Sequence, residues 1–217
     1  MQRSDFRHFD RLRVRWVEVD LQKIVFNGHY LMYFDTAVAG YWRALAMPYH
    51  DTMAQLAGDL YVRKASLEYH ASARYDEQLE VGIRTGRIGN SSMVMEAGVF
   101  RGDELLVSGE LVYVFADPST QTSQAIPQEL RDVLQSFEAG KAMVDVRVGS
   151  WDELGREAGA IRGKVFVEEQ KIPADLEWDG ADAVAVHAVA YNRFGVPLPP
   201  DACSNTCLAW PRSGAWR

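Results

Sequence analysis

Residues 20–35, D-L-Q-K-I-V-F-N-G-H-Y-L-M-Y-F-D, constrain the fold more than any other part of the chain. A single carboxylate, Asp20, follows a strand-like stretch at 12–19 and precedes an apolar triplet and a polar Asn27-Gly28-His29 turn. A helix then begins whose apolar residues recur at i, i+3, i+4 and i+7, the stripe of a helix that lies on a sheet. Its members are Tyr30, Tyr33, Phe34, Ala37, Val38, Tyr41 and Leu45.

The start of this helix is a candidate acyl-transfer site. Backbone N–H groups at a helix start have no partner within the helix and carry partial positive charge. An acid placed just before them faces any polarised carbonyl that binds there. The alternative interpretation is that Asp20 only caps or orients the loop.

Four strand-like segments joined by short turns follow the helix, at 61–72, 79–88, 92–100 and 104–115. Leu79, Val81 and Ile83 alternate with Glu80, Gly82 and Arg84, as in a strand with one buried face. The turns at 89–90 and 102–103 contain Gly and Asn or Asp, which suit hairpins. The order strand, helix, four strands predicts an α+β domain in which an antiparallel sheet wraps one long helix, the hotdog arrangement.

Three segments resemble a known family. R-W-V-E-V-D-L-Q-K-I-V-F-N-G-H-Y-L-M-Y-F-D-T-A, V-R-K-A-S-L-E-Y-H-A-S-A-R-Y-D-E and L-V-Y-V-F-A-D, taken in order, are similar to the 4-hydroxybenzoyl-CoA thioesterase-like hotdog proteins, the YbgC-type acyl-CoA thioesterases. The resemblance spans residues 6–117 and implies hydrolysis of an acyl-CoA thioester. This chain departs from the family pattern at Lys23, because these proteins usually have Gly three residues after the catalytic Asp.

The resemblance also implies roles for individual residues. Asp20 matches the catalytic carboxylate, acting as nucleophile or as general base, and the amide of Asn27 matches the donor to the thioester carbonyl. His29 is a further catalytic candidate, and Tyr30 stands beside it where the helix opens. The alternative is that His29, as a histidine at the start of a helix, has only a structural role.

Substrate-binding candidates lie on the helix and the strands. Tyr33 and Phe34 are candidates to line an acyl pocket, with Tyr30 at the helix opening, although aromatic residues at helical spacing commonly form core. Lys64 and Arg74 are candidates for the CoA phosphates, with solvated strand residues as the alternative. Open strand edges invite pairing with another chain, and the family resemblance implies a homodimer or homotetramer whose sites are shared.

Composition excludes several other classes. The net charge of −7 argues against nucleic acid as a partner. The two cysteines and five histidines form no ligand pattern, so we expect no metal and no cofactor beyond the coenzyme A of the substrate. No stretch is long enough to span a bilayer and residues 1–10 are charged, so a cytoplasmic protein is expected.

The length of 217 residues predicts a second unit. We expect a hotdog thioesterase domain at 1–138, a linker at 139–143 and a further unit at 144–198. The pattern I-R-x-x-V-F-V-E-E-Q, with E-W-D after it, resembles the N-terminal part of GNAT-type N-acetyltransferases, and without the family's later Gly-rich cofactor loop it implies a truncated GNAT-like fragment.

The tail at 199–217 shows neither helical nor strand period. A GC-rich reverse translation, shifted by one base, yields GNAT-like strings such as T-G-R-L-L and I-G-R-M-A, which suggests that the tail is out of frame. Three functions therefore compete: acyl-CoA thioesterase, a non-catalytic acyl-CoA or acyl-carrier binding module motivated by Lys23, and an acetyltransferase whose GNAT half is inactive.

Overall fold

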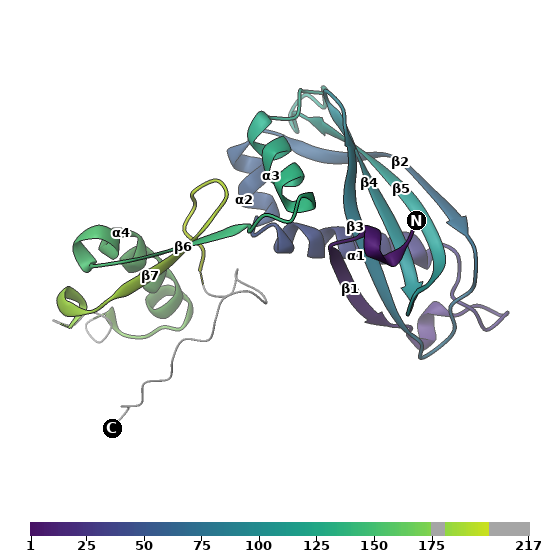
Figure 1. Cartoon of the computed structure of the whole chain (residues 1–217), viewed down its shortest axis with the longest axis horizontal. Coiled ribbons are helices and arrows are strands. Elements are labelled where there is room, and N and C mark those ends of the chain that lie inside the picture. Colours follow the sequence, from purple (N-terminus) through teal and green to yellow (C-terminus); the bar gives the residue numbers. More distant parts are fainter. Residues whose placement is uncertain (175–180, 200–217) are drawn as a thin grey trace. The chain divides into compact units, whose positions relative to one another are not determined.

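A computed structural model of the chain describes residues 1–174 and 181–199, and it divides into two compact units, Met1–Met143 and Val144–Arg217. Figure 1 shows the elements of each unit. The first unit contains η1 (Arg3–Asp5), β1 (His8–Arg13), η2 (Trp16–Glu18), α1 (His29–Ala44), α2 (Tyr49–Gln55), β2 (Asp59–Tyr69), β3 (Gln78–Ile88), β4 (Ser92–Arg101), β5 (Glu104–Ala116) and α3 (Gln128–Glu138).

The five strands of the first unit form one antiparallel sheet in the order β1-β3-β4-β5-β2. The four strands predicted after the helix are confirmed, with ends within three residues of the expected ones. In β3 the predicted buried face is confirmed, because Leu79, Val81 and Ile83 are all 1% exposed or less, whereas on the other face Glu80 and Arg84 are half-buried and Gly82 is buried. The Gly102-Asp103 turn joins β4 to β5, and Gly102 has a φ of +60°, which glycine adopts without strain.

The sheet curves around α1, whose apolar stripe forms the core of the unit (Figure 1). Phe34 and Tyr41 are 0% exposed. Helix and sheet approach closely at Gly109 of β5, where an added Cβ would lie 2.5 Å from Phe34 Cε2 and 3.0 Å from the carbonyl oxygen of Ser66. A glycine is therefore required at this crossing. The α+β hotdog fold predicted from the element order is confirmed for this unit.

Two short stretches before and after α1 differ from the sequence prediction. The strand expected at 12–19 is wrong: β1 covers His8–Arg13, and Trp16–Glu18 form the 3-10 turn η2. The reason is pairing, because Arg13 lies opposite Gln78, the first residue of β3, and no strand among the described residues pairs with the chain beyond Arg13. Helix α2, which begins after Pro48, was not predicted.

Helix α3 follows Pro127 and buries Leu130, Val133 and Leu134. Its last residue, Glu138, holds it to the unit by accepting hydrogen bonds from the Thr85 N–H at 2.7 Å and the Tyr41 hydroxyl at 2.6 Å. Tyr41 is thus a buried helix residue whose hydroxyl donates to a carboxylate far from the start of α1.

The second unit contains β6 (Val144–Gly149), α4 (Trp151–Arg162), the π-helical turn η3 (Gly163–Glu169), η4 (Asp182–Val184) and β7 (His187–Asn192). Its two strands pair antiparallel, and Leu154, Ala158, Val189 and Tyr191 form a small core. Strand β7 begins at His187, because β6 offers a partner only up to Gly149, opposite His187. Helix α4 ends at Arg162, where η3 follows. Apart from Pro199, the predicted tail lies outside the described residues.

Candidate active site

Asp20 lies in a tight loop that is closed by a β-bridge between Val19 and Val25. Its N–H donates to the Ile24 carbonyl and its own carbonyl accepts from the Lys23 N–H, both at 2.9 Å. Carboxylate oxygen Oδ1 accepts the Gln22 N–H at 2.7 Å, so Asp20 does orient its loop. Oδ2 has no hydrogen-bond partner among residues 1–174 and 181–199. One oxygen of a half-buried carboxylate therefore remains free to react.

The start of α1 supplies hydrogen-bond donors close to Asp20 in the chain. The His29 N–H donates to the Phe26 carbonyl at 2.9 Å, whereas the N–H groups of Asn27 and Gly28 have no acceptor in the part of the chain that the structure describes. Asn27 is exposed, and the helix behind these groups is 16 residues long. Two amides with partial positive charge are thus available to a carbonyl oxygen.

A buried carboxylate, Glu18, joins the loop to the helix. Its side chain accepts the Arg15 N–H at 2.7 Å, the Arg15 guanidinium at 2.8 and 2.5 Å, and the Tyr33 hydroxyl at 2.9 Å. Its backbone carbonyl accepts the Phe26 N–H at 2.9 Å. Burial opposes ionisation of Glu18, but the bonds from Arg15 and Tyr33 outweigh it and hold the pKa of this carboxyl below its ordinary value. Burial, and then the Glu18 carboxylate, raise the pKa of Tyr33 well above its ordinary range.

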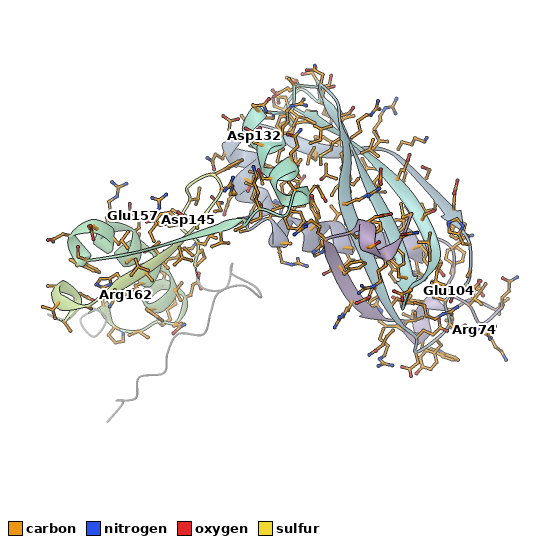
Figure 2. The ribbon with its side chains drawn as sticks, in the orientation of Figure 1. Arg74, Glu104, Asp132, Asp145, Glu157 and Arg162 are labelled. Atoms are coloured by element: carbon orange, nitrogen blue, oxygen red, sulfur yellow. The ribbon has the colours of Figure 1, made fainter. Side chains whose placement is uncertain are left out.

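The segment between β2 and β3 forms the other wall of this region. The Val25 N–H donates to the Ala73 carbonyl at 2.9 Å, and the Ala73 N–H donates to the Tyr30 hydroxyl at 3.1 Å. Arg74 is exposed, and its N–H donates to Glu77, which also pairs with Arg101. Figure 2 shows Arg74 at the same end of the first unit as Glu104, the other acid that Arg101 contacts. Arg74 is therefore a cation near the Asp20 loop that forms no ion pair with any of the described residues.

The predicted site residues fall into three groups in the structure. Asp20, Asn27 and His29 lie together on the loop and the first turn of α1, and the His29 Nδ1 contacts the sulfur of Met32 at 3.4 Å. Their catalytic roles stay predictions.

The aromatic candidates lie inside the unit. Tyr30, Tyr33 and Phe34 are 2%, 5% and 0% exposed, and the hydroxyls of the two tyrosines are occupied by Ala73 and Glu18. The aromatic rings therefore belong to the core of this chain, and contact with substrate stays a prediction for them.

The cationic candidates are exposed. Lys64 lies on β2 five residues before its end at Tyr69, about 16 Å along the strand at 3.3 Å per residue. The Tyr69 hydroxyl donates to the Asn27 carbonyl at 3.3 Å, so Tyr69 marks the site end of β2. Within one chain, Lys64 therefore lies well away from Asp20, unlike Arg74.

Sequence reasoning missed Glu18 and Arg15. A signal was present, since Glu18 is an acid between two valines, Val17 and Val19, in the strand-like stretch. Nothing in the sequence shows, however, that its carboxylate is buried. Among the described residues, no group of three or more His, Cys, Asp or Glu side chains is placed to hold a metal ion. Nor does any described helix have the length and apolar character needed to cross a membrane.

Comparison with known proteins gives one consistent result. Residues 22–108 match the model of the thioesterase superfamily. The acyl-CoA thioester hydrolase YbgC of Escherichia coli is 24% identical over 120 residues, which cover 55% of this chain and 89% of that protein. A Pseudomonas aeruginosa protein of solved structure is 30% identical with a TM-score of 0.56, covering 64% of this chain and 97% of the other.

A Thermus thermophilus thioesterase, solved with coenzyme A and zinc, shares the fold at 24% identity and a TM-score of 0.55, over 62% of this chain and 96% of that one. The match to the family model lies wholly within the first unit, and the matches to the three relatives cover 55–64% of this chain. The first unit of this chain therefore belongs to the thioesterase superfamily and has the hotdog fold.

Proposed function

We propose that the first unit hydrolyses an acyl-CoA thioester to the free acid and coenzyme A. The observation that carries this proposal is the free Oδ2 of Asp20, set on a loop that runs directly into two unpaired amides at the start of α1, in a thioesterase-superfamily domain. Relatives support the substrate class, since the similar Escherichia coli protein is an acyl-CoA thioester hydrolase and the Thermus thermophilus thioesterase binds coenzyme A.

The carbonyl oxygen of the thioester would accept the Asn27 N–H, which stabilises the negative charge that develops on it. As a nucleophile, Asp20 attacks the carbonyl carbon, the thiolate of coenzyme A leaves, and water hydrolyses the mixed anhydride. As a general base, Asp20 takes a proton from water, whose oxygen attacks the same carbon, and the thiolate leaves with that proton. Both routes use the same carboxylate and the same amide.

Asp20→Asn tests the role of the carboxylate, because it keeps the shape of the side chain and removes its charge. Thiol release from a panel of acyl-CoA thioesters should fall by about 10²–10⁴-fold. Asp76→Asn is the matched control, since Asp76 is exposed on the segment after β2 and its backbone φ of +69° suits asparagine. Normal turnover by a folded Asp20→Asn variant would exclude Asp20 as the catalytic group.

The same panel separates hydrolysis from the alternative of an acyl-CoA or acyl-carrier binding module. Binding without thiol release by the unmodified protein would favour the module. An acetyltransferase activity of the second unit, suggested only by its likeness to the N-terminal part of GNAT proteins, would appear as acetyl transfer to an amine.

We further propose that the active unit is a homodimer or a larger assembly formed through β2. This strand is an edge of the sheet, and Tyr61 and Val62 on it are 40% and 53% exposed. Such an edge favours pairing with a second chain. Pairing would also offer Lys64 to the partner's site, which it does not reach within its own chain. A monomeric mass by light scattering, with full activity, would contradict the shared site.

A further inference from the structure

Glu18 is the only acidic or basic side chain that is buried among residues 1–174 and 181–199, at 1% exposure. Burying a carboxylate costs free energy unless hydrogen bonds replace its water, and well-packed apolar residues commonly serve stability as well. Stability of the core alone therefore gives little reason for a carboxylate here. The geometry around it indicates a different role.

Three segments that build the candidate site meet at Glu18. Its side chain binds Arg15, at the start of η2, and the hydroxyl of Tyr33, one turn into α1. Its backbone carbonyl binds the N–H of Phe26, the residue before Asn27. Asp20 follows two residues later on the same loop. One residue thus ties the carboxylate-bearing loop to the helix start that carries the free amides.

We propose that Glu18 is a positioning residue that sets the distance between the Asp20 carboxylate and the amides of Asn27 and Gly28. It touches no substrate in this role. It acts through the Tyr33 hydroxyl and the Phe26 N–H, which prevent the loop and the helix start from moving independently. The expected effect on turnover rests on the proposed hydrolysis, whereas the role of Glu18 in holding the loop to the helix start does not.

The expected kinetic effect is on turnover rather than on binding. Misplacement of a reacting group by 1 Å can cost about 10²-fold in rate, so Glu18→Gln should lower kcat by about 10–10²-fold. Its KM should change by less than about threefold, because no group that contacts substrate is removed. Tyr33→Phe, which removes a single oxygen, should lower kcat in the same direction. The double variant should be no slower than Glu18→Gln alone, because both changes break one network.

Two matched controls separate positioning from general loss of stability. Tyr41→Phe also removes a buried hydroxyl of α1 that donates to a carboxylate, that of Glu138 at 2.6 Å. Glu80→Gln also removes a largely buried acid that binds two arginines, Arg3 and Arg11. Both controls should lower the melting temperature and leave kcat within about twofold, because neither residue touches the loop or the helix start.

Amide hydrogen exchange gives a readout that does not depend on activity. In Glu18→Gln and Tyr33→Phe, the hydrogen-bonded amides within residues 19–31, such as those of Asp20, Val25 and Phe26, should exchange faster, by tenfold or more, while those of β3 and β4 keep their rates. Tyr41→Phe should leave residues 19–31 unchanged.

Failure of the inference and failure of the proposed function look different. If the unmodified protein hydrolyses thioesters and Asp20→Asn abolishes this, but Glu18→Gln keeps its kcat, the positioning role is overturned and hydrolysis stands. If no thioester is hydrolysed, the exchange measurement still decides: unchanged exchange at 19–31 in Glu18→Gln overturns the role, and faster exchange confined to that segment supports it.

Discussion

Lys23 has a φ of +62°, in the left-handed region, in the loop that carries Asp20. An L-residue pays about 1–2 kcal/mol there because its Cβ crowds the following carbonyl. Glycine avoids this cost, but its greater conformational freedom in the unfolded chain lowers the stability of the fold by about 0.4–1 kcal/mol. We therefore expect Lys23→Gly to be more stable than Lys23→Ala, which keeps the Cβ, by about 0.5–1 kcal/mol. This comparison isolates the backbone effect, because both variants lose the same charged side chain.

Calorimetry of the two variants measures this difference as a shift in the unfolding transition of the first unit, of about 2–4 °C. Thiol release should stay within about twofold of the unmodified protein, because the Lys23 N–H already closes the turn onto the Asp20 carbonyl at 2.9 Å. Equal or lower stability of Lys23→Gly would refute the strain argument. If only Lys23→Gly hydrolysed thioesters, the unmodified chain would instead be a binding module.

Three further predictions concern packing, pH and the unit boundary. Gly109→Ala should cost about 1–3 kcal/mol of unfolding free energy in urea titration, because its Cβ would lie 2.5 Å from the buried ring of Phe34, and a cost near zero would contradict that packing. The pKa of Glu80 is lowered mainly by hydrogen bonding to Arg3, and that of Glu18 is also lowered, so both stabilise the fold above the ordinary value of 4.5 and lose this effect as the pH falls below it. Urea midpoints should therefore fall from pH 6 to pH 3, and Glu80→Gln should make this dependence on pH less steep. If the dependence is the same in Glu80→Gln, groups other than Glu80 cause the sensitivity to acid. A chain that ends at Met143 should unfold cooperatively and keep its thioesterase activity, and loss of both would show that the second unit is integral to the first.

The sequence alone determined the elements whose signal is local. Alternating residues such as Leu79 and Val81 predict β3 because each strand residue alternates between faces, and the apolar stripe predicts α1 because a helix repeats every 3.6 residues. The grouping of Asp20, Asn27 and His29 was also predictable, since ten residues of chain contain them all.

Only the tertiary structure decided where β1 ends and which polar groups are buried. The strand stops at Arg13 because its partner β3 starts at Gln78, 65 positions later, and a strand needs a partner for its hydrogen bonds. The hydroxyl of Tyr33 donates to Glu18, a partner that the sequence did not predict, because the fold buries both and each satisfies the other. Periodic patterns report contacts within a few residues, whereas strand pairing and buried hydrogen bonds depend on residues that only folding brings together.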